Sequence, residues 1–132
     1  MMSKNITRTF LRTDKMMTHY IETMKDRKEK GITENPFTNW QKFLVKEFKH
    51  WVITENEFPY DAVTDVNHMI LPKREVAFDW NLLNDDEKSE YIEIRENYLK
   101  QNYDSIWESL PRGQTTPGYF HLHLVVLKRE PA

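Results

Sequence analysis

Residues 118–127 read GYFHLHLVVL, and this alternation of side chains predicts a β-strand with two different faces. One face is apolar and suits a hydrophobic core, because it carries Phe120, Leu122, Leu124 and Val126. The other face carries Tyr119, His121, His123 and Val125. A lone histidine in a strand is usually structural and satisfied by one hydrogen bond, but two in one row are unusual. Imidazole can attack phosphorus, transfer protons or bind a metal ion, so this face is the first candidate for a functional site.

Two further segments accompany the paired histidines. Residues 68–73 read HMILPK, and residues 113–116 read GQTT shortly before the strand. In this order the segments resemble the histidine triad superfamily of nucleotide hydrolases and transferases. Members of that superfamily carry a His, three apolar residues and Pro-Lys, then a Gly-Gln-Ser/Thr loop that leads into His-x-His-x-His. The aromatic pair before His-Leu-His is also similar to the scavenger mRNA decapping branch. The resemblance covers roughly residues 43–128.

A fourth matching feature is Asn56, which stands three residues before Pro59. In the superfamily an Asp or Asn at this spacing holds the ribose hydroxyls of the nucleotide, so the resemblance implies that Asn56 binds ribose. The alternative is that Asn56 only shapes a turn before Phe58 and Pro59, because Asn and Pro both favour turns. Because the histidine motifs are also present, ribose binding is the favoured interpretation of Asn56.

The resemblance implies a covalent mechanism. His123 would attack the α-phosphorus of a nucleotide conjugate and form a nucleotidyl-histidine, with His68 and His121 orienting its ring. In a second register Tyr119, His121 and His123 fill the three triad positions, and His121 becomes the nucleophile. The match to the decapping strand favours the first register.

Hydrogen-bond donors to the phosphate are expected from the loop before the strand. Gln114 and Thr116 are the candidates, and Thr115 can replace Thr116 because residues 117–120 lengthen the loop. No cofactor is expected.

Val125 occupies the third triad position in the favoured register, where the superfamily has a histidine. By strand alternation we expect Val125 on the pocket wall beside the two histidines. Losing that donor makes a second function credible, a catalytically impaired nucleotide-binding or interaction module. A third is a metal site built from His68, His121 and His123, which suits zinc or iron.

The composition agrees with a small enzyme. A chain of 132 residues forms one domain, in which residues 1–41 are a helical N-terminal extension and residues 42–129 the core. The absence of cysteine excludes disulfides and the usual structural zinc fingers. No apolar run reaches the length of a membrane span or resembles a signal peptide, so a cytoplasmic protein is expected.

Charge is unevenly distributed along the chain. Residues 1–50 hold eleven Lys and Arg against six Asp and Glu, whereas residues 51–132 hold eight against fifteen. The basic residues near position 28 alternate with acids, which is typical of a solvated helix. Nucleic acid is therefore not the expected partner, except for capped RNA fragments. The expected partner is a nucleotide conjugate as substrate, and many small members of the superfamily are homodimers.

The remaining elements follow from periodicity and caps. A helix is expected over residues 15–30, with an apolar stripe of Met16, Tyr20, Ile21 and Met24 that packs in the core. A hairpin is expected over residues 43–48 and 51–55, and a long helix over residues 84–103. Further strands are expected over residues 68–72, 105–111 and 118–129. This order predicts an α+β domain with a mainly antiparallel sheet, helices on one face and the nucleotide site on the other.

Overall fold

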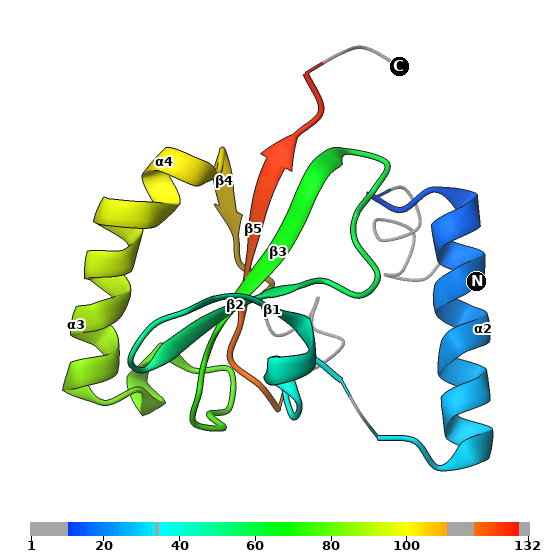
Figure 1. Cartoon of the computed structure of the whole chain (residues 1–132), viewed down its shortest axis with the longest axis horizontal. Helices are drawn as coiled ribbons and strands as arrows, with labels where there is room; N and C mark the ends of the chain where they lie inside the picture. Colours follow the sequence, from blue (N-terminus) through cyan, green and yellow to red (C-terminus); the bar gives the residue numbers. More distant parts are fainter. Residues whose placement is uncertain (1–10, 34, 111–117, 130–132) are drawn as a thin grey trace.

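The computed structural model describes residues 11–33, 35–110 and 118–129, and its centre is one five-stranded sheet (Figure 1). The strand order is β1-β2-β3-β5-β4, and all neighbouring strands pair antiparallel. The strands are β1 (Leu44–Glu47), β2 (Trp51–Glu55), β3 (Thr64–Pro72), β4 (Ser105–Trp107) and β5 (Leu122–Leu127). The predicted α+β fold with an antiparallel sheet is confirmed.

The register of the central strands defines two faces, because directly paired residues in antiparallel strands project to the same side. Ile70 of β3 pairs with Ile53 of β2 and with Leu122 of β5. We call this side of the sheet the apolar face. The next residue of β3, Met69, pairs with Thr54 and His123, and it defines the histidine face.

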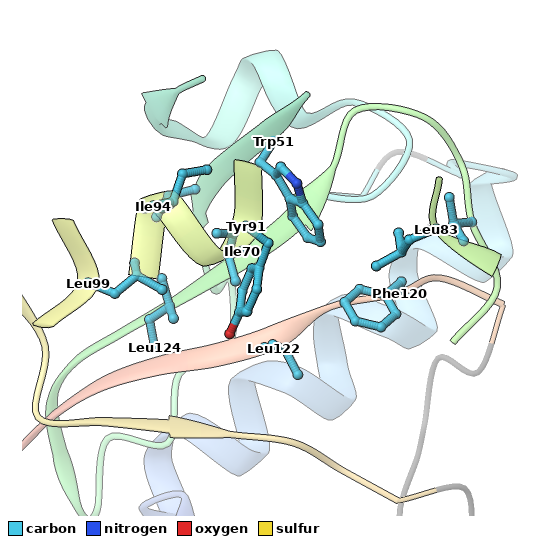
Figure 2. Packing of buried hydrophobic residues seen from close by; sticks show 11 residues of the cluster. Trp51, Ile70, Leu83, Tyr91, Ile94, Leu99, Phe120, Leu122 and Leu124 are labelled. Atoms are coloured by element: carbon cyan, nitrogen blue, oxygen red, sulfur yellow. The ribbon is translucent and has the colours of Figure 1, made fainter. Parts of the chain in front are cut away.

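The apolar face is covered by the long helix after β3. This helix begins as α3 (Asp85–Ile94) and continues through a π-helical turn (Arg95–Leu99) into α4 (Lys100–Asn102). The side chains of Asn84 and Glu87 form a capping box at its start. Figure 2 shows the packed interior, where Tyr91, Ile94 and Leu99 of the helical run meet Ile70 and Leu124 of the sheet.

The N-terminal helix α2 (Asp14–Lys30) lies on the other side of the sheet from α3 (Figure 1). Thr13 caps its start by accepting a hydrogen bond from the Met16 N–H, and Gly31 ends it in the left-handed conformation at φ 67°. No residue of α2 is buried, and Ile21 and Met24 are 56% and 45% exposed. The expected core packing of its apolar stripe is therefore wrong.

Polar contacts attach α2 to the connection between β2 and β3. Arg27 forms an ion pair with Glu57. The backbone N–H and the hydroxyl of Thr13 both donate to the carboxylate of Asp61, at 2.9 and 2.8 Å. The helix therefore forms a wall beside the sheet. These polar contacts and the rings of His19 and Tyr20 against Phe58 hold it there, although none of its own residues is buried.

Element bounds differ from the expectations mainly at strand ends. The hairpin of β1 and β2 is confirmed, and β3 starts four residues earlier than expected. In contrast, β4 and β5 are shorter than the expected strands, and residue 111, the expected end of the first of them, lies outside the described part. Short 3-10 turns at Trp40–Phe43 and Trp80–Leu82 were not expected. Among the described helices, none combines the length and apolar character that crossing a membrane requires.

Candidate functional site

A pocket of about 650 Å³ opens between α2 and the histidine face. Its size falls in the range of small-molecule sites. Both His121 and His123 line it, and the opposite wall contributes the cations Arg12, Arg27 and Lys28. Glu57 is the one acidic residue among the described residues that line the pocket, so this part of its wall favours an anionic ligand. Aromatic and aliphatic side chains complete the wall: Tyr20, Met24, Ile32, Phe37, Phe58, Tyr60 and Met69.

His121 has a defined tautomer. Its Nδ1 lies 3.0 Å from the carbonyl oxygen of Tyr119. A carbonyl can only accept, so Nδ1 carries the proton and donates it to this bond. Burial lowers the pKa of His121, which is only 8% exposed, although the bond to Tyr119 opposes the shift. The neutral ring is therefore favoured, and its Nε2 carries a lone pair.

The tautomer of His123 is set through Asn67. The Oδ1 of Asn67 accepts from the backbone N–H of Tyr60 at 3.0 Å and from the side-chain amide of Asn56 at 3.1 Å. These two donors fix the orientation of the Asn67 amide, so its Nδ2 must face Nδ1 of His123, at 3.1 Å. Because Nδ2 can only donate, Nδ1 of His123 accepts, and the neutral ring carries its proton on Nε2.

The two neighbouring rings therefore have opposite tautomers. The ring centroids of His121 and His123 are 5.3 Å apart, with an interplanar angle of 71°. His121 has a lone pair on Nε2, whereas His123 has an N–H on Nε2. A ring nitrogen with a lone pair and a ring N–H thus lie side by side on one wall of the pocket, an arrangement that permits nucleophilic attack and hydrogen bonding at a phosphoryl group.

His68 lies on the apolar face, away from this pair. It pairs with Leu124 in the sheet register, and its Nδ1 forms a 2.7 Å hydrogen bond with the Tyr103 hydroxyl. Burial lowers the pKa of His68, while the charge of Glu55 opposes the shift. The expected contact between His68 and the ring of His123 is not found. Asn67, one position earlier in β3, makes the contact with His123 instead. A shift of one residue along a strand moves a side chain to the other face.

Asn56 lines the pocket. Its amide is also part of the internal network, since its Oδ1 accepts from the Phe58 N–H at 3.1 Å and its Nδ2 donates to Asn67. Asn56 thus shapes the turn and positions Asn67. The hydrogen bond to Phe58 confirms the turn-shaping role, and ribose binding by Asn56 stays a prediction.

Three of the remaining expected site residues lie outside the described part of the chain, and the fourth, Val125, is buried. Gln114, Thr115 and Thr116 lie outside the described residues. Val125 is on the histidine face but is fully buried, between Asn67 of β3 and Ser105 of β4, and it does not line the pocket. The expectation that Val125 forms part of the pocket wall is wrong.

A three-histidine metal site is not formed. The described residues contain no group of three or more His, Cys, Asp or Glu side chains that could hold a metal ion. His68 projects from the opposite face of the sheet to His121 and His123, so the three rings cannot share one ion. This geometry overturns the third function considered above.

The sequence argument missed Asn67, Arg12 and Tyr60. Tyr60 stacks on His123 with ring centroids 5.0 Å apart, and the guanidinium of Arg12 lies over the rings of Tyr20 and Tyr60. The sequence did contain one indication of Asn67. By strand alternation Asn67, Met69 and Leu71 share one face, so Asn67 is a polar residue on an otherwise apolar face. Whether this face of β3 lies on the same side of the sheet as His121 and His123 depends on how β3 pairs with β5. Local sequence patterns do not determine that pairing.

Comparison with known proteins gives structural matches only. No family model and no curated protein matches the chain. The chain is similar to the crystal structure of a HIT family hydrolase from Legionella pneumophila Philadelphia 1, with 25% identity and a TM-score of 0.45, over 63% of this chain and 79% of that one. It is also similar to a structure described as a Hit Like Protein, with 16% identity and a TM-score of 0.47, over 70% of this chain and 98% of that one.

Proposed function

We propose that this chain is a nucleotide hydrolase or transferase that attacks the α-phosphate of a nucleotide conjugate through a covalent nucleotidyl-histidine. The observation that carries the proposal is the pair of opposite tautomers, His121 and His123, in one cationic pocket. A lone pair for attack and an N–H for the phosphoryl oxygens are the two groups that such a reaction needs from a protein.

His121 is the nucleophile in this proposal, as in the second register considered above. Its Nε2 lone pair attacks the α-phosphorus, and the bond from phosphorus to the leaving group breaks with its electron pair on the leaving group. The carbonyl of Tyr119 keeps the Nδ1 proton of His121 in place and stabilises the positive charge that develops on the ring.

His123 acts as a hydrogen-bond donor to a phosphoryl oxygen. Its Nδ1 lone pair is engaged by Asn67, so loss of the Nε2 proton would leave an imidazolate, which is too basic to form here. The Nε2–H therefore stabilises negative charge on the transferring phosphoryl group, where a positioned donor contributes most.

The second half-reaction restores the enzyme. Water attacks the phosphorus of the nucleotidyl-histidine and releases one proton to solvent. The P–N bond breaks, its electron pair returns to Nε2 of His121, and a nucleoside monophosphate leaves. An alcohol or amine in place of water would make the same chemistry a transfer.

The rest of the pocket fits a nucleotide conjugate. Apolar and aromatic side chains such as Phe37 and Phe58 offer packing surface for a base, and the cations of the α2 wall offer charge for phosphate. We propose that Asn56 binds the ribose, and that Gln114 with Thr115 or Thr116 donates to the phosphate.

Covalent labelling tests the proposal. The full chain is incubated with a panel of conjugates labelled at the α-phosphate: adenylyl and guanylyl phosphoramidates, dinucleoside polyphosphates and cap analogues. We expect an acid-labile, base-stable protein adduct, which is typical of a phosphorus–nitrogen bond. His121→Asn should abolish the adduct, whereas His123→Asn should slow its formation by about a hundredfold without abolishing it.

His68→Asn is the matched control, because His68 is a half-buried histidine of the neighbouring strand β3 that faces the opposite side of the sheet. It should label at the wild-type rate. A normal adduct in the His121→Asn protein would instead make His123 the nucleophile. Nucleotide binding without any adduct in the wild-type protein would identify a binding module and end the enzymatic proposal.

A further inference from the structure

The side chains of His121 and His123 form one wall of the pocket, which we call the histidine wall. We propose that the histidine wall supplies no proton to a departing group, so that the site selects conjugates whose leaving group departs as an anion. Phosphates and phenolates belong to this class, whereas amines do not. This inference rests on the proposed function and names the substrate class of the same site.

The amide of Asn67 is held in one orientation by four contacts. Its Oδ1 accepts from the Tyr60 N–H and from the Asn56 amide. Its Nδ2 lies 3.3 Å from the carbonyl oxygen of His68, which can only accept, and 3.1 Å from Nδ1 of His123. The contacts on both ends of the amide require the same orientation. Asn67 therefore presents an N–H, and not an oxygen, to His123.

This orientation prevents His123 from acting as a general acid. A neutral imidazole can release its Nε2 proton readily only if Nδ1 gains a proton. Here Nδ1 accepts from an amide N–H, which keeps its proton at neutral pH. A proton on Nδ1 would place two donors face to face, and the Asn67 amide would have to turn and break its other bonds. His123 can thus donate a hydrogen bond to a phosphoryl oxygen but cannot transfer its proton to a leaving group.

The charged side chains of the described pocket wall are poor sources of this proton. Glu57 forms an ion pair with Arg27, so it is present as a carboxylate without a proton to give. Arginine keeps its proton at neutral pH, and Lys28 is exposed on the α2 wall opposite the histidines. Tyr60 stacks on His123, so the face of its ring and not its hydroxyl meets the histidine wall.

A missing proton affects bonds to oxygen and nitrogen differently. When His121 attacks a phosphoanhydride or an aryl ester, the P–O bond breaks and its electron pair stays on oxygen, which departs as phosphate or phenolate. When His121 attacks a phosphoramidate, the P–N bond breaks and the pair stays on nitrogen, where the anion is too basic to form unless a proton arrives. General acid catalysis typically contributes about a hundredfold or more to such a step.

Two conjugates that differ in one bridging atom test the inference. They are the phenyl ester and the anilide of a nucleoside 5′-monophosphate, each prepared with adenosine and with guanosine. Both carry one negative charge and the same phenyl group, so they differ mainly in the leaving atom. The full chain is used in excess, and release of phenol or aniline in the first turnover is followed by HPLC. We expect the ester to react at least about a hundredfold faster than the anilide.

Asn67→Asp should supply the missing proton. The introduced carboxylate can accept the Nδ1 proton of His123 and favours the doubly protonated ring, whose Nε2 proton can then pass to the departing nitrogen. The ester-to-anilide ratio should fall at least about tenfold. Asn35→Asp is the matched control, because it adds a carboxylate to the same pocket wall but bonds to the backbone N–H groups of Phe37 and Thr38. Its ratio should stay within about threefold of wild type.

The outcomes separate this inference from the proposed function. Equal rates for ester and anilide in wild type, with a normal adduct on His121, would overturn the inference and leave the proposed function intact. An unchanged ratio in a folded Asn67→Asp protein would also overturn it, because the selectivity would not depend on the proton of His123. If Asn67→Asp does not fold, the wild-type ratio decides by itself. No adduct with any conjugate would reject both proposals.

Discussion

The side-chain amide of Asn67 donates to Nδ1 of His123 at 3.1 Å, and this contact leaves the proton of the neutral His123 ring on Nε2. Both bonds to the Oδ1 of Asn67 come from groups that can only donate, the Tyr60 N–H and the Asn56 amide. The tautomer of His123 is thus fixed by a chain of contacts that begins at the turn after β2. His121, whose Nδ1 donates to a carbonyl, has the complementary tautomer.

Asn67→Leu should destabilise the protein by about 2 kcal/mol or more, because the Tyr60 N–H and the Asn56 amide both lose their acceptor. Urea denaturation monitored by tryptophan fluorescence measures the change. Asn102→Leu is the control, since the Asn102 amide makes one exposed bond to Tyr98, and it should change stability by less than about 0.5 kcal/mol. Equal effects of the two substitutions would show that the Asn67 network contributes nothing to stability.

Val125→His should be destabilising. Val125 is 0% exposed, so a larger polar ring must enter a packed interior, at a cost of about 1 to 3 kcal/mol or more. The matched control is Val45→His on the edge strand β1, where the side chain is 38% exposed and the cost should be small. Urea midpoints compare the two. A Val125→His protein as stable as wild type, with faster substrate turnover, would mean that position 125 does open to the pocket.

Acid should destabilise the fold through His121. Burial lowers the pKa of His121 below its ordinary value of 6.5, so the unfolded chain binds a proton at a higher pH than the folded one. Stability contributed by the neutral ring is complete above pH 6.5 and is lost as pH falls below it. Unfolding curves at pH 7.5 and 5.5 should therefore differ more for wild type than for His121→Asn. An identical pH dependence of the two proteins would contradict the burial effect.

The wall formed by α2 should open more readily than the rest of the fold. None of its residues is buried, whereas Tyr91, Ile94 and Leu99 anchor the helical run that starts with α3. Hydrogen exchange measured by mass spectrometry should show faster exchange of α2 amides than of α3 amides, and salt should increase the difference. Equal protection of both helices would imply that α2 is held more strongly than its polar contacts indicate.

Local patterns in the sequence predict most of this fold. The alternation of residues 118–127 predicts the two faces of β5, and the acidic residues after Asn84 predict the start of α3. The position of His68 could not be predicted in this way. Its side of the sheet depends on the register between β3 and β5, and a shift of one residue exchanges His68 for Asn67.

The position of α2 relative to the sheet could not be predicted from local sequence patterns either. Its stripe of Tyr20 and Met24 has the spacing of a core-facing helix, yet both residues line the pocket. A periodic apolar stripe shows which side of a helix faces away from solvent. It does not show whether that side packs against the core or lines a pocket. Val125 illustrates the same limit, because alternation gives its face and not its depth.

The tautomers of His121 and His123 can be measured directly by long-range ¹H–¹⁵N correlation of the imidazole nitrogens at pH 7.5, assigned with His121→Asn and His123→Asn. We predict a protonated Nδ1 with an unprotonated Nε2 in His121, and the reverse in His123. In Asn67→Leu, His123 should lose this preference while His121 keeps its own. A proton on Nδ1 of His123, or the same tautomer in both rings, would contradict the assignment of His121 as the nucleophile.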